Sequence, residues 1–375
     1  MDGTGKKAVT ETEGIKQITR ADELLMAIAA CGELPAQLVP DVVRSASYAA
    51  ALITKLKEEN RIGCRFKDGL KGYVLHRKGK NYLMAAFPER MRPFLEGDAS
   101  LYPVKSEQSK RLRLHRMAYA WVQLYGLGAD TFSGEFPICS GVSRQGKPDG
   151  IYYSSVLVKQ RTAKEAGGSR ACGVLDVGEH GFCVYHTMDS LMKWMGRTEW
   201  TFRLRTGQAL YGAGEERRLQ ALILAKDMSM MERLLTSDGG IKRELFYLDD
   251  AYESWFYLPA IDSAKLQYRL LMNPALERQL ERILENVMQL RSGTGNSHRI
   301  DAEGCPVYFC WLLDLWQIRR IADQTARSRI GKVVCLDYQA EALRSCLGES
   351  VSIMGLNPEK VEVQLGLWEE TKKHE

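Results

Sequence analysis

Apolar residues between positions 45 and 60 recur at the spacing of an α-helix, with polar residues between them. Leu52, Ile53 and Leu56 fall on one stripe of such a helix, whereas Thr54 falls on the opposite side. Serines at the start of the segment are suited to cap its first turn. The pattern therefore predicts an amphipathic helix with a separate polar face.

Two further helices and a hairpin flank this segment. A helical pattern over 15–31 and a short second helix over 35–43 precede it, and the basic segment 61–80 follows it. Asp68 and Gly69 form a turn signal between strand-type residues, which predicts a β-hairpin. Three helices and a hairpin in this order predict a winged helix-turn-helix over residues 1–97. In that fold the third helix lies in the major groove of DNA and the hairpin, or wing, touches the backbone.

A long basic helix is predicted after a connector. Residues 80–87 have the pattern of a closing helical turn, and residues 88–103 contain three prolines, which favours a connector. Residues 109–126 carry apolar positions at helical spacing and a basic N-terminal half. We expect this segment to form a basic linker helix within residues 98–137.

Strands and helices alternate from about residue 138 onward. Strands are expected at 151–159, 219–225, 305–313, 333–336 and 351–354, and hairpins at 171–186 and 245–258. Helices are expected after Asp189 and over 225–235, 274–290, 315–327 and 339–347. The alternation predicts a mixed α/β domain over 138–375. Two subdomains are expected to meet near 291–300, where the sequence is rich in Gly and Ser.

Basic residues are concentrated in the N-terminal third of the 375-residue chain. The formal net charge is +5, and segment 61–116 alone holds 14 Lys and Arg against 5 Asp and Glu, a balance of +9. A basic segment beside a helix-turn-helix pattern indicates phosphate binding. The alternatives are a solvated surface and a winged helix that contacts only proteins.

The remaining composition narrows the class of protein. No apolar run approaches the ~20 residues that span a bilayer, and the polar N-terminus lacks a signal-peptide pattern, so we expect a cytoplasmic protein without membrane contact. The nine cysteines include no Cys-x-x-Cys pair, and the six histidines are scattered. We therefore expect no disulfide framework, no zinc site and no cofactor.

Residues 75–79, Leu-His-Arg-Lys-Gly, resemble a turn that follows the wing in one family of winged-helix proteins. That family has a Leu-Thr-x-x-Gly type turn here, so His76 stands where threonine is usual. Together with the Arg-rich helix that follows, the pattern is similar to the replication-relaxation family of bacterial plasmids and integrative mobile elements. The resemblance implies binding of double-stranded DNA in mobile-element replication, transfer or transcriptional regulation.

Candidate DNA contacts follow from these elements. Base contacts are expected from the third helix, through Ser47, Tyr48, Thr54 and Lys55. Phosphate contacts are expected from the hairpin and the turn after it, through Arg65, Lys67, Lys71, Arg77, Lys78 and Lys80. A second backbone contact is expected from the linker helix, through Lys110, Arg111 and Arg113. The domain over 138–375 is expected to serve assembly or a protein partner.

Residues 147–150, Lys-Pro-Asp-Gly, followed by Lys159 after a predicted strand, resemble the Pro-Asp…(Asp/Glu)-x-Lys pattern of metal-dependent nucleases. In those enzymes two carboxylates hold Mg²⁺ against the scissile phosphate, and the lysine helps to position the attacking water. Leu157 stands where the second carboxylate belongs, and it cannot ligate Mg²⁺. We therefore predict no catalytic residue and keep alternatives open. They are a Mg²⁺-dependent nuclease that uses Asp149 and Lys159, a degenerate restriction-endonuclease-like fold without activity, and a protein-interaction component of a phage or defence system.

Overall fold

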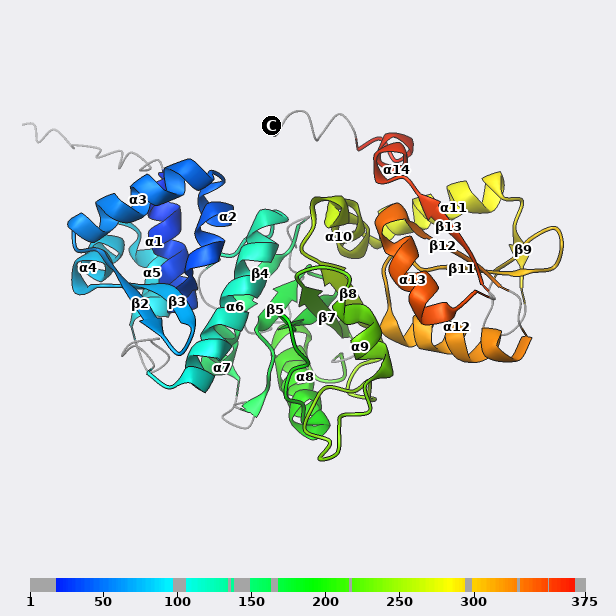
Figure 1. Ribbon diagram of the computed structural model, residues 1–375, viewed down its shortest axis with the longest axis horizontal. Helices are drawn as coiled ribbons and strands as arrows, with labels where there is room; N and C mark the ends of the chain where they lie inside the picture. Colours follow the sequence, from blue (N-terminus) through cyan, green and yellow to red (C-terminus); the bar gives the residue numbers. More distant parts are fainter. Residues whose placement is uncertain are drawn as a thin grey trace, which may run out of the picture.

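The structure is a computed structural model that describes residues 18–96, 106–133, 136–137, 149–162, 168–215, 218–293, 299–328, 331–349 and 351–367. Three groups of elements follow one another along the chain and lie in a row (Figure 1). We call them the head (18–96), the central domain (106–272) and the C-terminal domain (274–367). Each group contains one β-sheet.

The head consists of α1 (Arg20–Cys31), β1 (Leu34–Pro35), the 3-10 helix η1 (Ala36–Leu38), α2 (Val39–Val43), α3 (Ala46–Glu58), β2 (Ile62–Lys67), β3 (Leu70–Leu75), α4 (Arg77–Ala86) and α5 (Pro88–Leu95). Helix α1 is enclosed, because residues 24–31 are apolar on every side and are at most 1% exposed. The strands have the order β1-β3-β2. Asp68 and Gly69 both adopt positive φ between β2 and β3, as a type I′ hairpin turn requires.

The helices and the hairpin predicted for the head are present in the predicted order. The connector predicted over 88–103 was wrong over its described part, because residues 88–95 form α5. Pro88 is tolerated there because the first turn of a helix needs no N–H from it. Residues 97–103 of that connector and the predicted helix start at Ile15 lie outside the described residues.

Helix α6 (Gln108–Gly126) lies between the head and the central sheet (Figure 1). It packs against α1, α2 and β1 of the head and against β4 and β6 of the central sheet. Leu114, Ala118 and Trp121 are among its buried side chains. The segment predicted as a linker is therefore a packed helix that belongs to two cores at once.

The central domain continues with β4 (Ile151–Ser154), α7 (Ser155–Arg161), β5 (Gly173–Asp176), β6 (Gly181–His186), α8 (Gly196–Tyr211), β7 (Leu219–Ala225), α9 (Met230–Thr236), β8 (Trp255–Pro259), the 3-10 helix η4 (Asp262–Ala264) and α10 (Lys265–Met272). Its sheet has the order β4-β5-β6-β7-β8. Strands β4, β5 and β6 are antiparallel neighbours, whereas β6, β7 and β8 run parallel. Nearly every residue of β6 and β7 is buried, as expected for strands covered on both faces.

The C-terminal domain consists of α11 (Pro274–Val287), β9 (Arg291–Ser292), β10 (Arg299–Ile300), β11 (Pro306–Phe309), α12 (Leu315–Ser328), β12 (Lys332–Leu336), the 3-10 helix η5 (Asp337–Gln339), α13 (Ala340–Leu347), β13 (Ser352–Leu356) and α14 (Pro358–Gln364). Its sheet has the order β13-β12-β11-β10-β9. Strands β11, β12 and β13 are parallel, and β10 is antiparallel to β11. The mixed α/β class predicted from the sequence is therefore confirmed.

Several predicted elements of the central domain were wrong in detail. The strand expected over 151–159 ends at Ser154, and α7 replaces its second half. The helix expected after Asp189 begins only at Gly196, because residues 192–194 pair with residues 244–246. The hairpin expected over 245–258 is one strand, β8, which runs parallel to β7.

Candidate functional site

Helix α3 turns a polar face away from the rest of the molecule. Its apolar stripe, including Leu52 and Leu56, is buried in the head core. Its principal packing partners are α2 and β2 of the head, and it lies along the outer edge of the head in Figure 1. The four predicted base-contacting residues all have exposed side chains: Ser47, Tyr48, Thr54 and Lys55. Tyr48 is 46% exposed.

The wing formed by β2 and β3 carries cations beside an exposed aromatic ring. Lys67 and Lys71 are exposed near its tip. Phe66 pairs directly with Lys71 across the hairpin and is 75% exposed. Arg65 is half-buried, and its Nη1 lies 3.4 Å from Oε2 of Glu33.

The remaining predicted phosphate contacts lie on α4, directly after the wing. Arg77 and Lys78 are exposed in its first turn, and Lys80 is half-buried. Residues 45–80 together hold nine Lys and Arg against three Asp and Glu. Helix α3, the wing and α4 therefore carry an excess of positive charge.

A buried ion-pair network fixes the wing to α6. Arg111 donates from Nε to Glu33 Oε2 (3.0 Å), from Nη1 to the carbonyl of Lys67 (2.9 Å) and from Nη2 to the carbonyl of Leu70 (3.1 Å). His115 Nε2 lies 3.1 Å from Glu33 Oε1. Burial alone would raise the pKa of Glu33. Hydrogen bonds from His115 and Arg111 outweigh the effect of burial and lower the pKa to about 2. Glu33 is therefore a buried anion that holds both strands of the wing through Arg111.

The three residues predicted on the linker helix lie in different surroundings. Arg111 is fully buried and its donors are engaged by Glu33 and the wing, so it does not reach a DNA surface. Arg113 is half-buried and donates to the carbonyl of Ser169 in the central domain. Lys110 is exposed and pairs with Glu107 at 2.7 Å. Of the three predicted contacts on this helix, only Lys110 is exposed.

The residues of the nuclease alternative lie at opposite ends of β4. Asp149 precedes the strand, and its backbone carbonyl accepts a hydrogen bond from Tyr268. Lys159 lies in α7 after the strand and donates to the carbonyl of Ser169. Leu157, which stands in place of the second carboxylate, is 1% exposed and belongs to the core. Lys147 and Pro148 lie outside the described residues, and within those residues no group of three or more His, Cys, Asp or Glu side chains is arranged to hold a metal ion.

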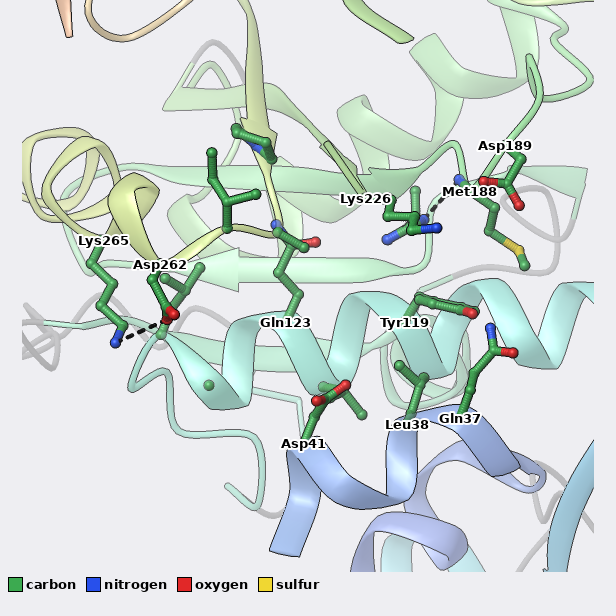
Figure 2. Close-up of a pocket in the computed structure, with 17 residues that line it drawn as sticks. Gln37, Leu38, Asp41, Tyr119, Gln123, Met188, Asp189, Lys226, Asp262 and Lys265 are labelled. Atoms are coloured by element: carbon green, nitrogen blue, oxygen red, sulfur yellow. Dashed lines mark hydrogen bonds and ion pairs between the residues drawn. The ribbon is translucent and has the colours of Figure 1, made fainter. Parts of the chain in front are cut away.

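A cleft that the sequence analysis did not predict lies where three parallel strands end. Strands β6, β7 and β8 point their carboxyl ends at α6 and the head, and a cavity of about 840 Å³ opens there (Figure 2). Ligand sites are common at this edge of parallel sheets. Polar lining residues come from the head, from α6 and from the strand ends: Gln37, Asp41, Tyr119, Gln123, His186, Asp189, Lys226, Asp262 and Lys265.

The cleft offers carboxylates and ammonium groups in similar number, so its charge favours no single class of ligand. His186 Nδ1 accepts a hydrogen bond from the backbone N–H of Met188, and burial lowers the pKa of His186 to about 3. This histidine is therefore neutral at physiological pH. A sequence signal for the cleft was the charged residue that lies one to three positions after each buried strand: Asp189 after β6, Lys226 after β7 and Asp262 after β8.

Comparison with known proteins supplies no relative for this chain. No protein-family model matches it, and neither a curated protein nor a solved structure matches it. The winged helix, the replication-relaxation resemblance and the nuclease-like fold therefore stay predictions that depend on the residues themselves. Among the described helices, none is both long and apolar enough to cross a membrane.

Proposed function

We propose that the head binds double-stranded DNA, with α3 in the major groove and the wing and the start of α4 on the backbone. The observation that carries the proposal is the exposed face of α3, which holds Ser47, Tyr48, Thr54 and Lys55 and which no described residue buries, together with the exposed cations of the wing and of α4 that follow it in the chain. A helix of this kind fits the major groove, which is ≈ 12 Å wide. Lysine and arginine at its margins supply the sequence-independent part of binding.

The buried network supports the same proposal through the position of the wing. A hairpin on a folded protein is ordinarily able to bend about its base, which weakens any contact at its tip. Here the carbonyls of Lys67 and Leu70, on either side of the turn, are held by one buried guanidinium. The backbone that carries Lys67 and Lys71 is therefore held in place on the head, which lowers the entropy cost of binding.

The biological role follows from the resemblance of residues 75–79. If the DNA-binding head acts as in replication-relaxation proteins, the protein works in the replication, transfer or transcriptional regulation of a mobile element. Residues 138–375 are then the part available for assembly or for a protein partner.

The test is the affinity of the full chain for duplex DNA as a function of salt, measured by fluorescence anisotropy. Four phosphate contacts predict a loss of roughly 100-fold between 50 and 200 mM salt. The double variant Lys67→Gln/Lys71→Gln should weaken binding to all duplexes and reduce the salt dependence by about two contacts. Tyr48→Ala and Lys55→Ala should weaken binding in a sequence-dependent way.

Arg282→Gln is the matched control, because Arg282 is an exposed cation on α11 of the C-terminal domain. It should leave affinity and salt dependence unchanged. Absence of binding to any duplex at 50 mM salt would refute the proposal. In that case the exposed rings of Tyr48 and Phe66 favour the alternative of a protein partner on the same face.

A further inference from the structure

Four cations gather on the central domain where α6 meets α7 and the start of β5. Arg113 and Arg116 are three residues apart on α6 and so share one face of the helix. Lys159 comes from α7 and Arg170 from the segment before β5. Arg113 Nη2 and Lys159 Nζ donate to the same atom, the carbonyl oxygen of Ser169, at 3.0 Å and 3.4 Å. Two charged groups from different elements therefore converge on one point, next to the backbone of Arg170.

Within the described part of the chain, one buried carboxylate, Glu199, offsets part of this charge, because it raises the pKa of Arg113 and of Lys159. Glu199 is buried, and its carboxylate accepts hydrogen bonds from Ser169 Oγ (2.6 Å), Tyr185 (3.0 Å) and the backbone N–H of Arg170 (2.8 Å). None of the four cations forms an ion pair with a described carboxylate. Arg116 instead donates to the hydroxyl of Ser190 at 3.2 Å.

The cations consequently repel one another. Burial lowers the pKa of Arg113, and the charge of Arg170 lowers it further. Burial, then the charge of Arg113 and a smaller contribution from Arg170 lower the pKa of Lys159 to about 8, although the charge of Glu199 opposes them. A protein that keeps such a cluster together loses folding stability, and a bound anion would recover it.

We propose that Arg113, Arg116, Lys159 and Arg170 form a second phosphate-binding site, which contacts the backbone of the same DNA duplex that the head binds. This inference depends on the proposed function of the head. Arginine forks and a lysine ammonium are the donors that proteins use for phosphodiester oxygens. Arg170 is exposed and the other three are half-buried, so an anion reaches them from the solvent side.

The position of the cluster relative to the wing supports one continuous DNA path. Arg111 holds the wing tip, and Arg113 follows it by two residues on α6. Two residues correspond to about 3 Å along the axis and about 200° around it. The wing and the cluster therefore flank the N-terminal half of α6, which is ~10 Å wide. Exposed Lys110 lies in the same part of the helix. In Figure 1 the hairpin of β2 and β3 lies beside this end of α6.

The test compares a duplex of about one helical turn, ~10 bp, with one of about three turns. Arg170→Gln should lower affinity for the long duplex about fivefold at 0.15 M salt and reduce the slope of log K against log salt by about 0.9. The short duplex, which the head fills, should be bound as by the wild type. Arg170→Lys should retain most of the affinity, and Arg282→Gln is the control for loss of one exposed charge.

The possible outcomes distinguish failure of the proposal for the head from failure of the proposal for the cluster. If the wild type binds no duplex, both proposals are refuted. If the wild type binds with a steep salt dependence and Arg170→Gln is indistinguishable from it on both duplexes, the cluster proposal alone is refuted. A further experiment measures the thermal unfolding midpoint of the wild type and of Arg170→Gln with and without inorganic phosphate. Stabilisation of the wild type but not of Arg170→Gln, with equal duplex affinities, would assign the site to a free phosphate compound and refute the DNA contact.

Discussion

Replacing Glu33 by glutamine removes the carboxylate that faces Arg111 and His115 in the interior. Glutamine has nearly the same shape, so the main change is the loss of the negative charge beside a buried guanidinium. The pKa of Glu33 is about 2 in the folded protein against an ordinary value of 4.5. At about 1.4 kcal/mol for each pKa unit, the charge contributes about 3 kcal/mol to the free energy of unfolding at pH 7. Removal of one partner of a buried ion pair gives a similar figure, about 3–5 kcal/mol.

The sign of the pH dependence distinguishes this reasoning from a simple packing defect. Because the folded-state pKa is the lower one, the contribution is complete above about pH 4.5 and is lost as the pH falls toward 2. The difference between wild type and Glu33→Gln should therefore shrink from about 3 kcal/mol at pH 7 to about 2 kcal/mol at pH 3.5. Denaturant unfolding followed by circular dichroism measures it, and other acidic groups cancel in the difference.

Two results would refute the argument. One is a difference that stays constant over this pH range, since a cavity or a lost contact does not titrate. The other is a difference below about 1 kcal/mol at pH 7, which would mean that water or another cation compensates the charge. The double variant Glu33→Gln/Arg111→Met supplies the control. It should be more stable than Glu33→Gln alone, because it no longer leaves a buried cation unpaired.

Three further predictions test other parts of the structure. Lys159→Met should raise the free energy of unfolding of the DNA-free protein by about 1–2 kcal/mol at pH 7. The pKa of Lys159 is about 8 in the folded protein and 10.5 ordinarily, so the wild type becomes more stable as the pH rises from 8 to 10.5. The advantage of the variant in denaturant unfolding should therefore be smaller at pH 10. Gly173→Ala would place a methyl group 2.3 Å from the carbonyl oxygen of Tyr153 in the neighbouring strand; we expect a loss of about 1–3 kcal/mol, and an unchanged midpoint would contradict that packing. Phe66→Ser should change the free energy of unfolding by less than about 0.5 kcal/mol, because the ring is mostly in solvent. A larger change, seen as a shift of the thermal midpoint, would mean that the wing is covered.

Elements with strong local signals were predictable. The helix over 46–58 has a capping serine and a regular apolar stripe, and the turn at Asp68 and Gly69 fits one hairpin type. Helices α12 and α13 and strands β12 and β13 follow the same rule, whereas the strand predicted over 305–313 ends at Phe309, and β9, β10 and α14 were not predicted. Local pattern is sufficient where an element's own residues determine its conformation.

Elements determined by distant contacts were not predictable. Residues 151–159 are rich in β-formers, yet α7 begins at Ser155, because Leu157 and Val158 are buried against the neighbouring head and sheet. Tertiary packing overrides propensity in such segments. Arg111 was assigned to DNA from its basic neighbours, but its partner, Glu33, lies 78 residues away in the sequence. The cleft at the ends of β6, β7 and β8 likewise combines segments separated by many residues.

Helix α6 also determines how the head can be separated from the rest of the protein. A fragment that ends at residue 97 contains every element of the predicted winged helix, but it leaves Glu33 inside the fold without Arg111 or His115. Anyone who wishes to transplant the head onto another protein must therefore carry the chain as far as residue 126. The shorter piece would keep the complete recognition surface and lose the charge that neutralises its interior.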